Sequence, residues 1–317
     1  MQSLLKSSAR VPSTLLRAFS TTKPLLLSST RKVTSQAHAE PLSSVNASEI
    51  AHFSRLSSQW WDERGEFALL HRMNPPRVQF IRDKILEFKR EEATARGEDS
   101  IDEGKGVLKG WGALDVGCGG GLLSESLARL GARTLAIDAS ESNINIASLH
   151  SSADPHLAST LAYRCIAAED LLAGDSPKKQ YDVVCSMEVL EHVDNPSAFL
   201  RTLGELVKPG GHLFLSTIAR TPLAHLLTIT MAEDVLRFVT SGTHHYSKFI
   251  NPEELIDFFR SDLRWFSGEP TRKEAEVRGI IYLPWRSEWV VPPRGTPGVT
   301  SCNYLFWARK PLEGRLQ

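Results

Sequence analysis

The hydrophobic pattern of the chain separates a helical segment from a longer one in which strands and helices alternate. In residues 48–88, apolar side chains recur at three- and four-residue spacing, which predicts amphipathic helices. The sequence Asn74-Pro75-Pro76 lies inside this segment, and we expect the helix to break there because proline removes a helical hydrogen bond. Residues 89–110 are charged and contain glycine, so they predict a surface loop or linker.

After Gly110, short apolar runs alternate with helical patterns, as is typical of a parallel α/β domain. We expect strands at residues 113–116, 134–137, 161–165, 181–185 and 212–217. Helices are predicted at residues 122–130 and over most of 190–207. Two further runs, 276–283 and 303–310, are separated by a proline-rich stretch and predict an antiparallel hairpin.

The composition of the N-terminus differs from that of the rest. Residues 1–39 contain six basic side chains and no Asp or Glu, and they are rich in Ser, Thr and Leu. This is typical of a mitochondrial transit peptide, with a disordered basic tail as the alternative. We therefore expect a transit peptide at 1–40, N-terminal helices and a charged linker at 41–110, and the main domain at 111–317.

Charge and cysteine content exclude some classes of protein. The 317 residues carry 37 basic and 37 acidic side chains, so no polyanion is favoured and we expect no nucleic-acid partner. None of the four cysteines forms a C-x-x-C pair, which argues against a zinc knuckle or a disulfide scaffold.

A glycine-rich loop, residues 117–121, follows the first predicted strand. Glycine permits positive φ angles and close approach to a ligand, but the spacing fits neither the nucleotide-triphosphate motif nor the dinucleotide fingerprint. Asp138 ends the second strand, 21 residues after Gly117. A carboxylate at this place can accept both hydroxyls of a ribose, and helix capping is the alternative.

Four motifs in this domain resemble the class I S-adenosylmethionine-dependent methyltransferases: DVGCGGG, AIDAS, YDVVCSMEVLEHV and LVKPGGHLFLSTI. Two others, WWDERGEFALLHRMNPPR and GTHHYSKFINPEEL, resemble the ubiquinone-biosynthesis O-methyltransferases of mitochondria and bacteria. The resemblance spans about residues 50–310. It implies a Rossmann-like, seven-stranded α/β sheet with helices on both faces and an antiparallel final strand.

The same resemblance implies a function. The methyl donor would be S-adenosyl-L-methionine, and the acceptors would be the catechol hydroxyls of 3,4-dihydroxy-5-polyprenylbenzoate and of demethylubiquinol. The enzyme would be peripheral on the matrix side of the mitochondrial inner membrane, in a multi-subunit coenzyme Q biosynthetic complex. The alternatives are a methyltransferase for another small molecule and a non-catalytic scaffold with the methyltransferase fold.

Carried over by motif, the cofactor contacts of the family fall on Arg77, Gly117, Asp138 and Met187. The guanidinium of Arg77 would bind the cofactor's carboxylate. Met187 would pack on the adenosyl group, although an apolar residue at a strand end is also a core residue. The acid that meets adenine in many of these enzymes is displaced here, within residues 167–170, so the adenine contact stays open.

Glu188, Glu191 and His192 follow the fourth strand. If these residues are helical, Glu188 faces both of the others, and their oxygen and nitrogen atoms suit a divalent metal. Spacing alone favours a pocket lining or a helix cap, whereas the resemblance favours a metal, Mg²⁺ first and Zn²⁺ or Mn²⁺ as alternatives. A metal would lower the pKa of a catechol hydroxyl; without one, His192 is the natural general base.

The apolar stretch after the fifth predicted main-sheet strand predicts a helix that begins at Pro222. It is too short to span a bilayer, and Glu233, Asp234 and Arg237 interrupt it. It would be either a lid packed on the domain or a membrane-contacting insertion at about 220–245. The resemblance favours membrane contact, because the family's substrates carry isoprenoid chains.

Overall fold

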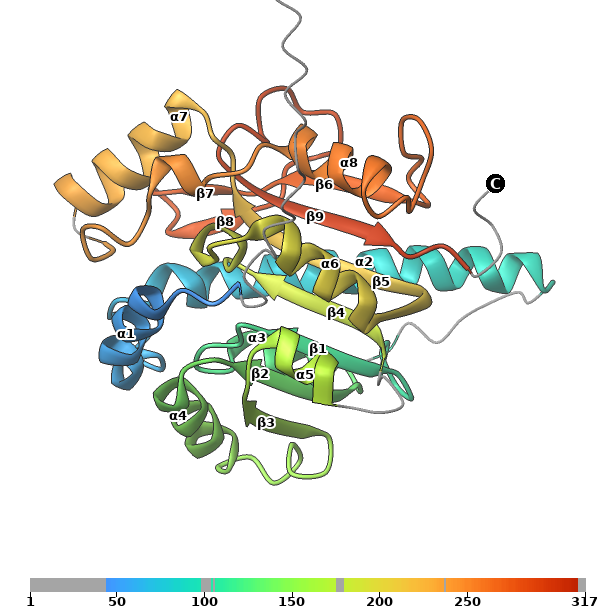
Figure 1. The fold of residues 1–317 in the computed structure, drawn as a ribbon, viewed down its shortest axis with the longest axis horizontal. Coiled ribbons are helices and arrows are strands. Elements are labelled where there is room, and N and C mark those ends of the chain that lie inside the picture. Colours follow the sequence, from blue (N-terminus) through green and yellow to red (C-terminus); the bar gives the residue numbers. More distant parts are fainter. Residues whose placement is uncertain (1–43, 98–103, 105, 175–179, 237, 313–317) are drawn as a thin grey trace, which may run out of the picture. The chain divides into compact units, whose positions relative to one another are not determined.

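The computed structural model describes residues 44–97, 104, 106–174, 180–236 and 238–312 (Figure 1). The chain divides into two units, Met1–Glu40 and Pro41–Gln317, and all described residues belong to the second. The predicted transit peptide lies outside the described residues.

A seven-stranded sheet with the order β3-β2-β1-β4-β5-β9-β6 forms the centre of this unit. Its strands are β1 (Gly112–Val116), β2 (Arg133–Asp138), β3 (Leu161–Cys165), β4 (Tyr181–Met187), β5 (Val207–Ile218), β6 (Ala275–Gly279) and β9 (Asn303–Arg309). The last strand, β9, is inserted between β5 and β6 and runs antiparallel to both. The predicted sheet with an antiparallel final strand is therefore confirmed.

Helices precede β1 and connect the successive strands from β1 to β6. They are α1 (Ala47–Leu56), η1 (Ser57–Gln59), α2 (Ala68–Ala95), α3 (Leu122–Arg129), α4 (Glu141–Ser151), α5 (Ala168–Gly174), η2 (Leu190–His192), α6 (Pro196–Leu206), α7 (Pro222–Ala224), η3 (His225–Val235), η4 (Tyr246–Lys248) and α8 (Pro252–Ser261). A separate hairpin pairs β7 (Ile281–Leu283) with β8 (Glu288–Val290).

The helices cover both faces of the sheet (Figure 1). Apolar side chains of α2 and α3 pack on one face, where Phe80 and Ile81 meet Phe214 of β5. Those of α5, α6 and α8 pack on the other, where Phe259 meets Phe306 of β9. Burial on two faces explains the nearly continuous apolar sequence of the central strands.

The predicted break at Asn74-Pro75-Pro76 is wrong, because α2 runs through both prolines from Ala68 to Ala95. Met73 and Phe80, on either side of them, are buried against the sheet. Apolar burial of this kind contributes about 2 kcal/mol per side chain, which offsets the lost backbone hydrogen bonds. The helix also extends into the predicted linker, so the linker begins after Ala95.

The predicted helix at Pro222 is present. Several of its apolar side chains face solvent, and an acidic one is buried. Thr221 caps it, and after α7 it continues as a π-helix, η3. Leu223, Leu226, Leu227 and Val235 are exposed, whereas Glu233 is buried. Among the described residues, no helix combines the length and the apolar character needed to cross a bilayer.

Candidate active site

The glycine loop lies at the carboxyl end of β1, between β2 and β4. Gly117, Gly119 and Gly121 have positive φ angles of 73°, 52° and 88°. A Cβ atom added to Gly117 would lie 2.5 Å from Cγ2 of Val189, which follows β4. The loop therefore needs glycine for its backbone conformation and for the close approach of a neighbouring segment.

Asp138 ends β2 beside this loop. Its Oδ2 accepts a hydrogen bond of 2.9 Å from the Gly119 amide, and its Oδ1 accepts one of 2.8 Å from the Ser140 amide. Burial raises the pKa of Asp138, and these hydrogen bonds act in the opposite direction. The carboxylate thus lies at the end of β2 beside the glycine loop, as predicted. Its contact with a ribose stays a prediction.

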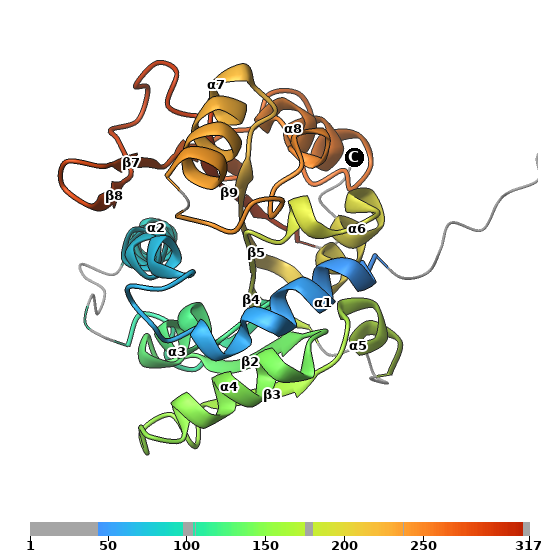
Figure 2. The same cartoon turned by 90° about the vertical axis from the view of Figure 1, so that its left-hand side faces the viewer.

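The segment from Ser44 to Phe67 lies across the carboxyl ends of the strands, with α1 in front of the sheet in Figure 2. Trp61 donates from Nε1 to the Gly120 carbonyl at 3.0 Å, and Ser54 and Ser140 share a hydrogen bond between their hydroxyls. Trp60 stacks on Phe67 and lies so close to the loop that a Cβ on Gly120 would be 2.5 Å from it. The glycine loop is therefore covered by an N-terminal segment, which we call the cover.

The cover also contacts residues 167–170, which contain the displaced acid, and the loop before α6. Ser44 donates from its amide and its hydroxyl to Oε1 of Glu169, at the start of α5. Asn46 donates to Oδ1 of Asp194 at 2.6 Å. Both acids therefore bind the cover in this arrangement.

Arg77 of α2 is buried, with 5% of its surface exposed. One terminal nitrogen lies 3.0 Å from Oε1 of Glu188, and that oxygen also accepts a hydrogen bond from the Ser216 hydroxyl. Nε of Arg77 has no hydrogen-bond partner among the described residues. A buried guanidinium with an unused donor fits an anion such as a carboxylate.

The expected helical spacing of Glu188, Glu191 and His192 is wrong. Glu188 has a left-handed backbone with a φ of 55°, and only Leu190–His192 form a single 3₁₀ turn. Glu188 pairs with Arg77, Glu191 accepts from Thr217 at 2.8 Å, and Nδ1 of His192 lies 3.1 Å from Oε2 of Glu49. Over the described residues, no group of three or more His, Cys, Asp or Glu side chains is arranged to hold a metal ion.

The three groups nonetheless interact electrostatically. Burial raises the pKa of Glu191, and the charge of Glu188 raises it further. Burial would lower the pKa of His192, but the hydrogen bond to Glu49 and the charges of Glu191, Glu49 and Glu188 outweigh it, so the pKa is raised. Oε1 of Glu191 has no hydrogen-bond partner within the part of the chain that the structure describes.

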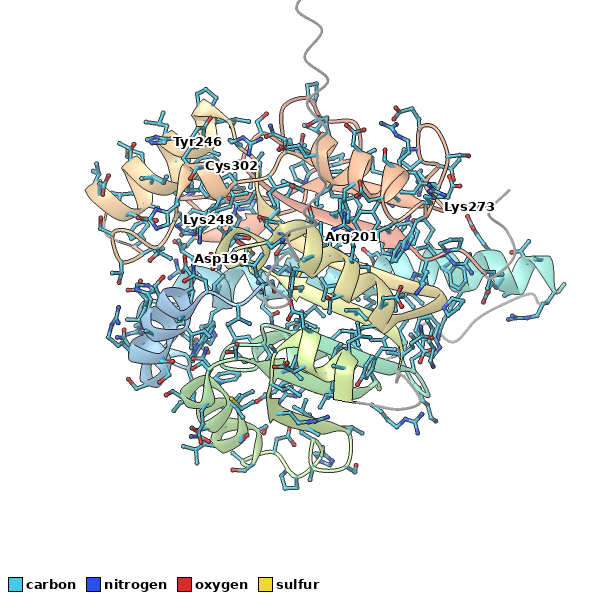
Figure 3. The ribbon with its side chains drawn as sticks, viewed as in Figure 1. Asp194, Arg201, Tyr246, Lys248, Lys273 and Cys302 are labelled. Atoms are coloured by element: carbon cyan, nitrogen blue, oxygen red, sulfur yellow. The ribbon has the colours of Figure 1, made fainter. Side chains whose placement is uncertain are left out.

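Glu49 of α1 is a site residue that the sequence did not reveal. Burial opposes its charge, but the hydrogen bonds and charges of His192 and Lys248 lower its pKa to about 2. Lys248 lies 3.3 Å from Oε1 of Glu49 and 4.0 Å from Asp194, beside which it is drawn in Figure 3. The carboxylate of Glu49 thus holds the His192 ring from a helix more than a hundred residues away in the chain.

Asp115 of β1 is a second such residue. It is buried and accepts a 2.6 Å hydrogen bond from the Ser124 hydroxyl. Burial raises its pKa to about 6, although Ser124 and the charge of Arg77 act against this. The signal in the sequence is its position in β1, two residues before the first glycine of the loop.

Met187 ends β4 and is buried in the apolar cluster that includes Cys185 and Val183. The alternative role as a core residue is therefore present in the structure. Its contact with an adenosyl group stays a prediction.

Comparison with known proteins decides the family. The family model of a methyltransferase domain matches residues 77–262. The mitochondrial ubiquinone biosynthesis O-methyltransferase of Schizosaccharomyces pombe is 42% identical over 270 residues, which cover 85% of this chain and 88% of the relative. The chain belongs to the ubiquinone biosynthesis O-methyltransferase family.

A bacterial member of this family, from Caulobacter vibrioides, is 42% identical over 279 residues, which cover 88% of this chain and all of the relative. Among solved structures, an S-adenosylmethionine-dependent methyltransferase of Thermotoga maritima, described as a possible histamine N-methyltransferase, matches with a TM-score of 0.51. It is 14% identical and covers 83% of this chain and 99% of its own, so it shows the fold alone. The predicted family and fold are both confirmed.

The close approach at Gly117 can be tested with two alanine variants. Gly97 and Gly117 have nearly equal φ angles, 74° and 73°, but a Cβ on Gly97 meets nothing within 4 Å. We expect Gly97→Ala to cost about 1–2 kcal/mol of unfolding free energy, from the backbone alone. Gly117→Ala should cost a further ~1–3 kcal/mol, because its Cβ displaces Val189. Urea denaturation measures both, and equal costs would contradict the packing described for the loop.

Proposed function

We propose that the protein transfers a methyl group from S-adenosyl-L-methionine to a catechol hydroxyl of polyprenylated ubiquinone precursors. The precursors are 3,4-dihydroxy-5-polyprenylbenzoate and demethylubiquinol. The observation that carries the proposal is the 42% identity to named ubiquinone biosynthesis O-methyltransferases along most of the chain. A methyltransferase for another small molecule and a non-catalytic scaffold are the alternatives.

The residues present fit the cofactor. When bound, the cofactor supplies an electrophilic methyl group on a sulfonium. Arg77, with its unused buried donor, would hold the carboxylate, and Asp138, beside the glycine loop, would hold the ribose. Gly117 and Met187 would line the remaining surface. The carboxylates of Asp115 and Asp138, on either side of the glycine loop in sequence, favour a cationic group at this edge of the sheet.

The acceptor hydroxyl has to lose its proton, since a phenol ionises near pH 10. We propose His192 as the general base. Glu49 binds Nδ1 of the ring, so Nε2 is the nitrogen left to accept a proton. An imidazole oriented by a carboxylate is a recurring catalytic pair.

A divalent metal, Mg²⁺ first, is a second candidate for activating the hydroxyl. It is supported by the unpartnered Oε1 of Glu191 and by the nearby charge of Glu188. The residues as arranged do not fit it, because Arg77 and Ser216 engage Glu188 and Glu49 engages His192. The proposed proton transfer therefore uses His192 and no metal ion.

We further propose that the protein is peripheral on the matrix side of the mitochondrial inner membrane. The basic N-terminal composition and the mitochondrial relative support import. The exposed leucines of α7 and η3 support contact with a lipid surface, because an apolar face without a protein partner is costly in water. Membership in a coenzyme Q biosynthetic complex rests on the sequence resemblance alone.

Transfer of labelled methyl to a short-chain 3,4-dihydroxybenzoate analogue tests the activity. We expect transfer by the wild type and a loss of about 10²–10⁴-fold in kcat for His192→Asn, since this change removes the base. Full turnover in excess EDTA, with no metal in the protein, would assign activation of the hydroxyl to His192 alone. If EDTA abolishes the activity and Mg²⁺ restores it, a metal activates the hydroxyl. Calorimetric binding of the cofactor without transfer to any catechol would refute the function.

Liposome flotation tests the membrane contact. We expect the double variant Leu226→Glu with Leu227→Glu to be released from anionic liposomes while its affinity for S-adenosylmethionine is unchanged. The control is Leu149→Glu on α4, because Leu149 is 70% exposed but lies outside this helix. Equal binding by the wild type and the double variant would contradict the assignment.

A further inference from the structure

The structure brings a second imidazole to the site. His244 belongs to the segment GTHHYSKFINPEEL, from which no site residue was predicted. Its ring centroid lies 6.0 Å from that of His192 and 6.2 Å from that of Phe249. The ring of His192 also forms a T-shaped pair with that of Phe53 from the cover, with the centroids 5.1 Å apart. Two imidazoles thus lie close together at the same edge of the sheet.

A buried carboxylate orients this second imidazole. Oε1 of Glu233 lies 2.6 Å from Nδ1 of His244 and also accepts the His244 amide at 2.9 Å, while Oε2 accepts the Gly242 amide at 2.8 Å. Glu233 is 1% exposed, whereas Leu226, Leu227 and Val235 of the same helix are exposed. Because the carboxylate accepts the proton of Nδ1, Nε2 of His244 is left as an acceptor.

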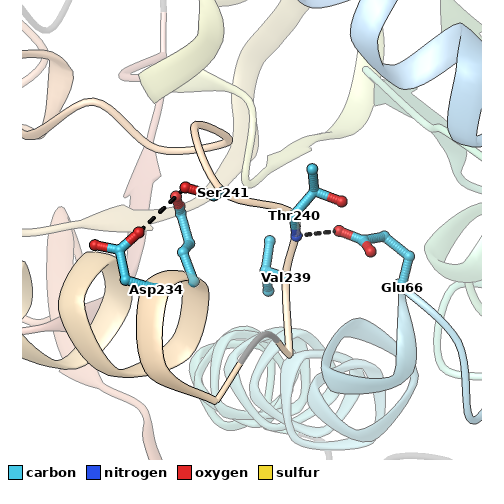
Figure 4. A pocket seen from close by; sticks show the side chains of 6 residues that line it. Glu66, Asp234, Val239, Thr240 and Ser241 are labelled. Atoms are coloured by element: carbon cyan, nitrogen blue, oxygen red, sulfur yellow. Dashed lines mark hydrogen bonds between the residues drawn. The ribbon is translucent and has the colours of Figure 1, made fainter.

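The loop that carries His244 is held on both sides. Figure 4 shows Thr240 donating its amide to Glu66, near the start of α2, and Ser241 bonded to Asp234 of η3. The hydroxyl of Thr243 lies 3.3 Å from Nε2 of His52 in the cover. These contacts fix the ring of His244 relative to both η3 and α1.

A catechol has two adjacent hydroxyl groups, and only one of them receives the methyl group in a given turnover. The other is a hydrogen-bond donor that has to be satisfied when the substrate enters a closed site. One oriented imidazole serves the reacting hydroxyl, and a neighbouring oriented imidazole suits the other. Sites built in this way reject analogues that lack the hydroxyl.

We propose that His244, oriented by Glu233, accepts a hydrogen bond from the catechol hydroxyl that is not being methylated, and so makes the site selective for catechols over simple phenols. The proposal rests on the proposed function, with His192 serving the reacting hydroxyl. It assigns His244 as a substrate-contacting residue and Glu233 as its positioning residue.

The test is a binding comparison on the full chain in the presence of S-adenosylhomocysteine. The ligands are 3,4-dihydroxybenzoate and the two compounds that lack one hydroxyl, 3-hydroxybenzoate and 4-hydroxybenzoate. We expect the wild type to prefer the catechol. His244→Ala should lower the affinity for the catechol about tenfold and remove most of the preference, with little change for the better-bound monohydroxy compound.

Three further variants sharpen the test. His245→Ala is the matched control, because His245 is the adjacent imidazole and is exposed, so it should keep the preference. His244→Gln, whose amide oxygen accepts a hydrogen bond, should retain part of it. Glu233→Gln keeps the side-chain volume but loses the carboxylate that fixes the ring, so the preference for the catechol should fall. If His244→Ala no longer binds S-adenosylhomocysteine, Glu233→Gln replaces it as the test variant.

The proposal would be overturned if His244→Ala kept the full catechol preference, or if Glu233→Gln did where it replaces His244→Ala. The Glu233–His244 contact would then be only a structural link between η3 and the loop that follows it. A wild type that transfers methyl to the catechol but binds all three compounds equally would overturn the proposal alone. A wild type that neither binds nor methylates the catechol would overturn the proposed function together with it.

Discussion

The buried ion pair between Arg77 and Glu188 is the interaction on which the arrangement of the site depends. It joins α2, on one face of the sheet, to the segment that follows β4. Two charges removed from water need further partners, and here Ser216 supplies one to Glu188 while Nε of Arg77 is left unused. The pair therefore joins α2 to the left-handed turn after β4, and it leaves Nε of Arg77 as the donor that we propose for the cofactor's carboxylate.

Residues distant in the chain complete the site around this pair. The cover brings Glu49 to His192 and Trp60 to the glycine loop, and the segment after η3 brings His244 beside His192. Each imidazole is held by a carboxylate from another element. The matched methyltransferase domain, residues 77–262, thus supplies strands β1 to β5, the glycine loop and both imidazoles, while the cover that precedes it supplies Glu49.

The sheet could be predicted because strands buried on both faces give short apolar runs. The position of Asp138 could be predicted because the carboxyl ends of parallel strands meet at one edge of the sheet. The course of α2 through its two prolines could not be predicted, since it depends on how Met73 and Phe80 pack on strands far away in sequence. Glu188 was misplaced because its backbone follows its tertiary bonds to Ser216 and not local spacing. Glu49 and His244 were missed because their partners lie in other segments.

Calorimetry of Arg77→Met with two ligands tests the central claim most directly. S-adenosylmethionine has the carboxylate that Arg77 is proposed to hold, and 5′-methylthioadenosine lacks it. The account predicts that the substitution weakens binding of S-adenosylmethionine about 10–100-fold and leaves that of 5′-methylthioadenosine nearly unchanged, while the exposed Arg72→Met on the same helix affects neither. An unchanged affinity for S-adenosylmethionine, or an equal loss for both ligands, would contradict it.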